Sequence, residues 1–588
     1  MATRLKPVDV VLVGMGFTGA IMARELAQDG LSIVGLERGG RRDTVPDWQS
    51  PAMHDELRYA IRNEMFQNVV TETYTFRNHT GEEALPIRIL SSFLPGTDLG
   101  GAGVHWNGHT WRFLPSDFRM RSHYTERYGA QSIPHEVTIQ DWGVTYDELE
   151  PHFDRFEYLC GIGGKAGNLR GQIQAGGNPF EGPRSREYPL PPMDPAYAGA
   201  LFANATLELG YTPFQIPSAN MTRSYTNPEG LSLQACNVCG FCERFGCEHF
   251  AKASPQTVIL PKVFESPNFE LRTNAHVTRV LLDGRGRRAT AVLYVDGQGN
   301  EIEQPAELVI LCAFSLNNVK LMLNSGIGQA YDPATGEGTV GRNYTYQTMS
   351  AATVFYPDDI NINPFMGAGA LGTVIDDFNG DNFDHTGLGF VGGGYISANT
   401  TGGRPIEYHP TPPGTPRWGL RWKQAVRRHY NHTVGLSAHG SSMPTRGNYL
   451  SADPTYRDAY GQPMLRITYD FPENDLRMSR YITDRMTEIA RIMGGETVST
   501  AYRATPYSIV PYQTTHNNGG AIMGTDRRTC AVNRYLQSWD VPNVFVQGAS
   551  AFPENAGYNP TGTVGALAYW SVKAIREQYL KNPGPLVQ

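Results

Sequence analysis

The first forty residues contain a pattern that few folds can accommodate. Val8 to Val13 is an apolar, β-branched run typical of a buried strand. The segment GMGFTG (residues 14–19) follows at once, and apolar residues then recur at helical spacing as far as Gly30. Leu31 to Leu36 is a second short apolar run, which ends at Glu37. This order predicts a strand, a glycine-rich turn, a helix and a second strand, as at the start of a dinucleotide-binding α/β fold.

Each glycine of this turn has a physical task. Gly14 allows the tight turn, Gly16 lets the backbone approach a pyrophosphate, and Gly19 lets the helix pack on the strand. The pyrophosphate would lie at the helix N-terminus, where unpaired N–H groups favour negative charge. Glu37 lies near the position expected for an acid that binds ribose hydroxyls. A glycine-rich turn in another kind of α/β protein is the alternative, and the pattern alone does not separate FAD from NAD.

Length and charge exclude several classes of protein. A chain of 588 residues exceeds one ordinary core and predicts at least two domains. A net charge of −7 argues against nucleic acid as a partner. No apolar run approaches the roughly 18–20 residues needed to cross a bilayer. Residues 1–7 lead directly into the first strand and leave no room for a cleavable signal, which by itself predicts a cytoplasmic protein. Export by attachment to a signal-bearing partner remains open.

Four of the seven cysteines lie close together: Cys236, Cys239, Cys242 and Cys247. Such clustering indicates metal or redox chemistry more often than a disulfide framework. The spacing C-x2-C-x2-C-x4-C is close to that of iron–sulfur sites, because short loops can wrap several sulfurs around one cluster. Structural zinc is the competing interpretation.

A second glycine-rich segment, LGGAGVHWNGHTW, occupies residues 99–111. The paired Gly100 and Gly101 have little bulk and suit a loop pressed against a flat ring system. His105 and Asn107 bring polar atoms to the same place. A surface loop with incidental histidines is the alternative.

The remaining pattern alternates between α/β and β-rich regions. Helices are expected near residues 53–68, at 146–160, from Ser315 to Leu323 and from Asn474 to Gly494. A hairpin of residues 288–296 and 301–304 is expected across residues 297–299, with Leu308 to Cys312 as a further, buried parallel strand. Residues 335–505 alternate aromatic and β-branched runs with turns, which predicts a mostly antiparallel sheet. Residues 544–547 form another expected strand, followed by a closing helix.

With both ends considered, the chain resembles the glucose–methanol–choline (GMC) family of FAD oxidoreductases. Five segments carry the resemblance: GMGFTG at 14–19, LGGAGVHWNGHTW at 99–111, VILCAFSLNNVKLMLNSGIG at 309–328, HNNGG at 516–520 and VFVQGASAFPENAGYNPTGT at 544–563. The resemblance implies an α/β fold, in which a discontinuous Rossmann-type FAD-binding domain lies beside a mostly antiparallel-sheet substrate domain. The expected division assigns residues 1–125, 231–334 and 506–588 to the FAD-binding domain, including the iron–sulfur loop 236–247. Residues 126–230 and 335–505 are assigned to the substrate domain and to surface excursions.

The resemblance also assigns cofactor-binding residues. The first glycine turn and Glu37 would hold the ADP part of FAD, and Val277 would meet the adenine through its backbone. The other positions expected at the flavin are Gly100, Gly101, Asn107, Gly548, Ala549 and Asn559. His105 corresponds to the histidine that some members join covalently to FAD, which implies an 8α-histidyl link here.

The catalytic pair of the family corresponds to His516 and Asn559. Oxidation of an alcohol needs a base near the hydroxyl proton while hydride leaves carbon, and imidazole titrates near working pH. Asn559 would hydrogen-bond the same oxygen and orient it. A structural loop histidine is the alternative for His516.

Membrane-bound sugar and sugar-acid dehydrogenases of bacteria combine these features. The resemblance to their flavoprotein subunits implies oxidation of D-gluconate to 2-keto-D-gluconate, with glucose, fructose, sorbitol or 2-ketogluconate as alternative substrates. Relatives carry a three-iron (3Fe–4S) cluster, although four cysteines would allow a four-iron (4Fe–4S) one. Implied partners are a multihaem cytochrome c subunit, quinone beyond it, and a small subunit with an export signal. The complex would lie at the periplasmic face of the inner membrane.

Two further interpretations remain from the sequence. A sugar oxidase resembling pyranose 2-oxidase would need no metal relay, and a non-enzymatic subunit would keep flavin only as a fold element. The cationic segment Arg417 to Arg428 is either a solvated face or a docking site for a partner or anionic substrate.

Overall fold

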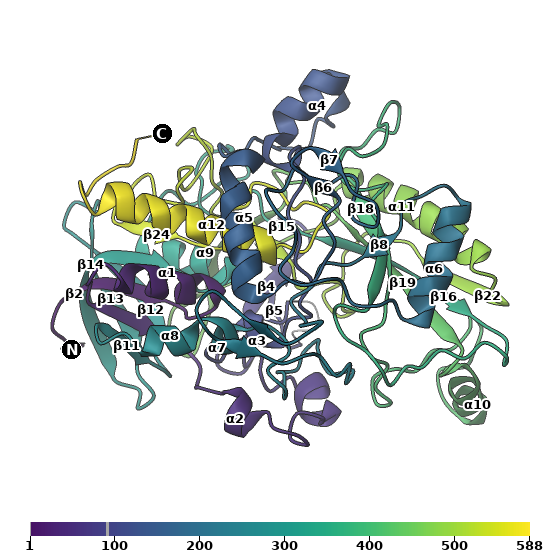
Figure 1. The fold of residues 1–588 in the computed structure, drawn as a ribbon. Helices are drawn as coiled ribbons and strands as arrows, with labels where there is room; N and C mark the ends of the chain where they lie inside the picture. The colour runs from purple at the N-terminus through teal and green to yellow at the C-terminus, as the bar shows by residue number, and fades with distance from the viewer. Residues whose placement is uncertain (1, 90–92, 588) are drawn as a thin grey trace.

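The computed structural model describes residues 2–89 and 93–587 and contains two main sheets (Figure 1). The parallel part of the first sheet has the spatial order β11 (Phe269–Arg272), β3 (Ile33–Leu36), β2 (Val8–Val13), β14 (Glu301–Leu311) and β24 (Val544–Val546). The two-residue strand β1 (Thr3–Arg4) also pairs parallel with β14. Strands β3 and β24 are apolar and fully buried, and β2 is buried from Val10 to Val13, as a parallel sheet between helices requires. The edge strand β11 is partly exposed.

The first glycine turn joins β2 to helix α1 (Phe17–Ala27). Gly14 has φ +97°, and a Cβ on Gly19 would lie only 2.1 Å from the Gly14 carbonyl oxygen. The helix therefore packs directly on the turn, which only glycine at both positions permits. Helix α12 (Thr561–Ala574), the expected closing helix, runs beside α1 (Figure 1).

Strand β14 corrects one expectation. Residues 301–304 and 308–312 were predicted as separate strands, but β14 is continuous from Glu301 to Leu311. Its first half pairs antiparallel with β13 (Ala289–Val295), and its second half pairs parallel with β2. The change of partner falls after Pro305, which lacks an N–H and so suits the end of one ladder. One strand thus joins the predicted hairpin to the parallel sheet.

The helix expected near residues 53–68 is wrong. Only the single π-helical turn Leu57–Ile61 forms there. The rest is an ordered loop, because the backbone of Met65 and Gln67 bonds to residues 95–97 instead of to a helical turn. Buried side chains of this loop, among them Met53 and Tyr59, pack against Phe245 of the cysteine-containing region.

The second sheet is antiparallel. Its six strands run in the order β22 (Thr497–Ala501), β16 (Thr348–Phe355), β19 (Thr433–Gly440), β18 (Gly394–Asn399), β17 (Gly372–Ile375) and β8 (Phe214–Gln215). Helix α11 (Glu473–Ile492) covers one face with the apolar stripe that its sequence predicts, including Met478, Ile482 and Met486. Helix α6 (Tyr197–Glu208) packs on β17 and β18 (Figure 1).

These two sheets confirm the predicted fold class, a Rossmann-type sheet beside a mostly antiparallel one. Helix α5 (Tyr146–Cys160) has the predicted bounds, with a Thr145–Glu148 capping box at its start. Within residues 2–89 and 93–587, no helix combines the length and apolar character that a membrane crossing requires.

Candidate functional site

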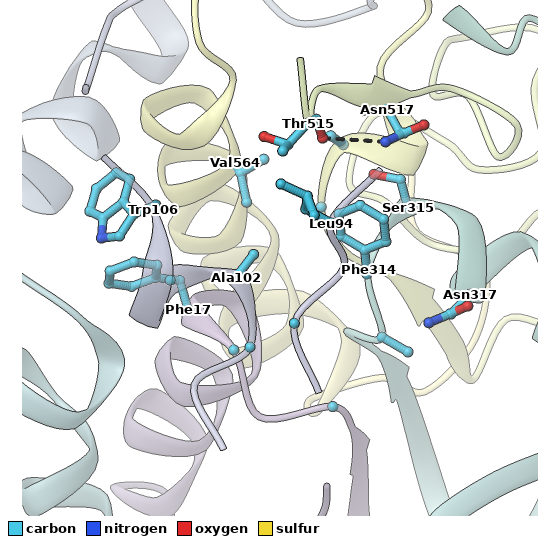
Figure 2. Close-up of a pocket in the computed structure, with 18 of the residues that line it drawn as sticks. Phe17, Leu94, Ala102, Trp106, Phe314, Ser315, Asn317, Thr515, Asn517 and Val564 are labelled. Carbon is cyan, nitrogen blue, oxygen red and sulfur yellow. Dashed lines mark hydrogen bonds between the residues drawn. The ribbon is translucent and has the colours of Figure 1, made fainter. Parts of the chain in front are cut away.

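A cavity of about 490 Å³ is lined by residues of both sheets (Figure 2). In this view Phe17, Ala102 and Trp106 lie on one side, and Phe314 and Thr515 lie on the other. Nearly all predicted cofactor and catalytic positions line it: Gly14, Gly16, Glu37, Gly100, Gly101, His105, Asn107, Val277, His516, Gly548, Ala549 and Asn559. Gly19 does not, because it faces the turn on which α1 packs. The tertiary structure thus gathers residues that are spread over the whole chain.

Bare backbone forms one wall of the cavity. A Cβ built on Gly101 would lie 3.9 Å from Gly16 Cα, so the two glycine-rich segments face each other without side chains between them. Gly100 has φ +89°, and a Cβ there would lie 2.4 Å from Gln256 Oε1. Such a surface admits a pyrophosphate and a flat ring closely, at the N-terminus of α1.

Glu37 lies where β3 ends. Its carboxylate accepts hydrogen bonds from Met15 N at 3.0 Å and Gly39 N at 3.1 Å. Burial raises the pKa of Glu37 to about 7, although these two bonds oppose the shift. The carboxylate therefore holds the glycine turn in place, and Glu37 and Val277 both line the cavity.

His105 lies at the end of the short helical turn α3 (Ala102–His105). Its Nε2 is buried and has no hydrogen-bond partner among the described residues. Burial, and then the charge of Lys252, lower the pKa of His105 to about 3, so the ring is neutral. A neutral imidazole with a free nitrogen at the cavity wall is the chemistry that a covalent flavin link requires.

His516 and Asn559 lie side by side. Asn559 Nδ2 is 3.3 Å from His516 Nε2. Asn559 Oδ1 accepts from Trp111 Nε1 at 3.1 Å and from the Tyr395 hydroxyl at 2.8 Å. Because an indole N–H only donates, these bonds assign the amide orientation and direct Nδ2 toward His516. His516 Nε2 is consequently the acceptor, and its Nδ1 carries the proton.

The amide of Gln347 holds that tautomer. Its Nε2 donates to the carbonyls of Ala556 (3.1 Å) and Tyr558 (3.0 Å), so its Oε1 is available only as an acceptor. His516 Nδ1 donates to this oxygen. Burial, and then the neighbouring His109, lower the pKa of His516 to about 3. His516 is therefore a neutral base that lines the cavity, and its unprotonated Nε2 accepts from Asn559 Nδ2.

The four clustered cysteines line a second, smaller cavity next to the first. Within the described chain, no three of their sulfurs lie mutually within 4.8 Å. Tetrahedral zinc, with Zn–S bonds of about 2.3 Å, needs sulfurs about 3.8 Å apart. Ligand atoms of His54, Cys239 and Glu248 do lie within 4.8 Å of one another. However, the Glu248 carboxylate already lies 2.9 Å from His54 Nε2.

The cysteine loop (residues 236–247) packs directly on the glycine-rich segment 99–111. Arg244 N donates to the His105 carbonyl at 2.8 Å. The buried Lys252 ammonium donates to the carbonyls of Trp106 (2.7 Å), Cys242 (2.7 Å) and Phe245 (2.9 Å). One cation thus ties the wall of the first cavity to the backbone that carries the cysteines.

The cationic segment Arg417 to Arg428 lies away from both cavities. Residues 420–428 of this segment belong to helix α10 (Leu420–His429). Arg428 forms exposed ion pairs with Asp358 and Glu496. None of its residues lines either cavity in the part of the chain that the structure describes. The solvated face is the better interpretation of this segment.

Comparison with known proteins agrees with this geometry. Models of the GMC oxidoreductase family match residues 222–349 and 444–568. The gluconate 2-dehydrogenase flavoprotein of Pantoea cypripedii is 51% identical over 593 aligned residues, which cover 100% of this chain and 96% of that protein. The chain belongs to the GMC oxidoreductase family. This confirms the resemblance found in the sequence, and the family implies FAD as the cofactor of an oxidoreductase that acts on CH–OH groups.

More distant GMC relatives align over nearly the whole chain as well. The fructose dehydrogenase large subunit of Gluconobacter japonicus is 24% identical, covering 98% of this chain and 99% of that protein. The crystal structure of pyridoxine 4-oxidase from Mesorbium loti matches with a TM-score of 0.58 at 17% identity, covering 97% of this chain and 99% of that one. At that identity the structural match bears on the fold alone.

Sequence reasoning missed three residues that line these cavities, His439, Arg244 and Lys252. It also missed Gln347, which bonds to His516. Arg244 lies within the cysteine segment, and Lys252 lies just after it. The sequence therefore already indicated that both residues lie near the cysteines. Gln347 and His439 lie in stretches whose sequence is typical of β-strands, and no neighbouring residue marks either of them as part of a site.

Proposed function

We propose that this protein is an FAD-dependent dehydrogenase that oxidises D-gluconate at C2 to 2-keto-D-gluconate. The observation that carries the proposal is the His516–Asn559 pair, which faces the same cavity as the two glycine-rich segments. The full-length relative named as a gluconate 2-dehydrogenase flavoprotein supports the substrate.

His516 and Asn559 would act on one hydroxyl group. His516 Nε2, unprotonated in the bond pattern above, accepts the hydroxyl proton, and Asn559 Nδ2 donates to the hydroxyl oxygen. Asn559 cannot turn away, because Trp111 and Tyr395 hold its oxygen. FAD, when bound, supplies the acceptor for the hydride that leaves the carbinol carbon. The residues of this chain therefore orient the alcohol and take its proton.

We assign a covalent FAD link to His105, supported by its buried, unbonded Nε2. Replacing His105 with asparagine should leave the flavin dissociable. After acid precipitation, yellow colour should remain in the wild-type pellet and appear in the supernatant of the variant. Complete loss of yellow colour from the wild-type pellet would show that FAD is not covalently linked to His105.

The cysteine loop would hold an iron–sulfur cluster, with three irons as the favoured form. Contacts of this loop with residues 99–111 support it, because they bring the cysteines close to the flavin wall. Such a cluster is a one-electron centre beside a two-electron one. Electrons would continue to a multihaem cytochrome c subunit and quinone. We infer a complex at the periplasmic face of the inner membrane, with export directed by a small partner subunit.

Arg244 is the cation that we assign to the carboxylate of the sugar acid. Its guanidinium lines the cavity, lies 5.3 Å from the Tyr512 ring centroid and pairs with Glu407 at 2.5 Å. Its Nε has no partner among the described residues. The other lysine and arginine of the lining, Arg38 and Lys320, are both paired with buried carboxylates near His276.

Replacing Arg244 with glutamine should raise KM for D-gluconate by about tenfold to a hundredfold, since a charge-assisted bond is lost. The rate of flavin reduction at saturating D-gluconate should change much less, because Arg244 is assigned to binding and not to proton transfer. Iron content must match the wild type, because Arg244 lies on the cysteine loop. A fall in kcat as large as the rise in KM would contradict the assignment.

The proposed function is tested by anaerobic flavin spectra recorded before and after addition of D-gluconate. Bleaching by gluconate, but not by glucose or sorbitol at the same concentration, supports C2 dehydrogenation of a sugar acid. Bleaching by a sugar or polyol alone would change the substrate and keep the chemistry.

A further inference from the structure

A second histidine, His439 on β19, faces the cavity beside the catalytic pair. Its ring stacks on Tyr395 with centroids 5.0 Å apart and planes 9° apart, and its centroid lies 6.0 Å from that of His516. Tyr395 is the residue whose hydroxyl donates to Asn559. His439 is therefore built into the same framework as Asn559.

The strand register brings Gln347 between the two histidines. Strand β15 (Thr345–Tyr346) pairs with β23 (Asn517–Asn518), and β16, which begins directly after Gln347, pairs with β19. Gln347 N donates to the His516 carbonyl at 3.3 Å, and two residues later Met349 lies opposite His439. Gln347 thus lies between β15, which pairs with β23 near His516, and β16, which pairs with β19 and His439.

One oxygen determines the tautomers of both histidines. Gln347 Oε1, which can only accept, receives His516 Nδ1 and also His439 Nδ1 at 3.1 Å. Both rings therefore carry their proton on Nδ1. His439 Nε2 forms no hydrogen bond with any residue in the described part of the chain, and His439 lines the cavity. Two acceptor nitrogens are consequently presented side by side.

We propose that His439 is a substrate-binding residue that accepts a hydrogen bond from the hydroxyl adjacent to the one being oxidised, and that Gln347 positions both histidines for this. The inference rests on the proposed function and adds to it a requirement for a vicinal diol. In D-gluconate the adjacent hydroxyl is that of C3, since C1 is the carboxylate. His516 takes the C2 hydroxyl, and His439 takes its neighbour.

The analogue 3-deoxy-D-gluconate tests this requirement on the unaltered holoenzyme. Flavin reduction by the analogue should have a kcat/KM about tenfold to a hundredfold below that of D-gluconate, because His439 Nε2 is left buried without a donor. Equal kcat/KM values for the two compounds would overturn the inference while leaving the proposed function intact. Failure of D-gluconate itself to reduce the flavin would instead overturn the proposed function.

A cycle that combines the substitution of His439 with removal of the C3 hydroxyl tests whether the two groups contact each other. His439→Leu should lower kcat/KM for D-gluconate by a similar factor and change little for the 3-deoxy analogue, because both changes remove the same bond. Additive losses would contradict direct contact between His439 and the C3 hydroxyl.

Gln347→Leu separates positioning from general structural damage. Loss of the shared acceptor should lower the rates and also bring the ratio of kcat/KM for D-gluconate to that for the 3-deoxy analogue toward one. A merely structural role would lower both rates and leave the ratio unchanged.

Discussion

Replacing His516 with alanine is expected to lower the rate of flavin reduction by D-gluconate by about 10²- to 10⁴-fold, the range that a general base contributes. The imidazole forms no part of the glycine-rich wall, so the flavin should remain bound. Stopped-flow reduction under anaerobic conditions measures the loss directly. A rate near that of the wild type would remove His516 from the mechanism.

The pH dependence of the same reaction supplies a second measurement. Burial lowers the pKa of His516 to about 3, so the ring should be largely unprotonated from neutral to weakly acidic pH. The reduction rate should therefore stay level from neutrality down to about pH 5 and fall only as pH approaches the lowered pKa. An acidic limb centred near the ordinary histidine pKa would contradict the lowered pKa of His516.

Replacing Cys242 with serine is expected to separate the two halves of the reaction. Cys242 is the most buried of the four clustered cysteines and lies beside Lys252 and Asn220. Its loss should remove the cluster, while reduction of the flavin by gluconate continues. Reoxidation by ferricytochrome c should fall at least about tenfold, because a two-electron donor is left without its one-electron relay.

Cys530→Ser is the matched control, since Cys530 is buried, is not among the residues that line either cavity, and its serine replacement can keep the bond from Gln140 Nε2. Iron and acid-labile sulfide should vanish in Cys242→Ser and persist in Cys530→Ser. Stoichiometric zinc without iron in the wild type would contradict the relay.

Much of the first sheet was predictable because its determinants are local. The β-branched run of β2, the glycine turn and the apolar face of α1 lie within thirty residues and follow backbone sterics and periodicity. The same holds for α5 and α11, whose caps and stripes fit within one helix. The loop at 53–68 was mispredicted because its apolar side chains serve contacts with Phe245 and not a helical face.

Residue type and spacing predicted the glycine turn and the cysteine loop, and the resemblance to the family predicted the histidine–asparagine pair. Only the tertiary structure decided how they act together. It placed Gln347 against His516 and His439 through the register of two strand pairs, and it directed Asn559 through Trp111 and Tyr395. The physical reason is that a hydrogen bond depends on positions in space, and residues up to 448 apart in the chain make these bonds.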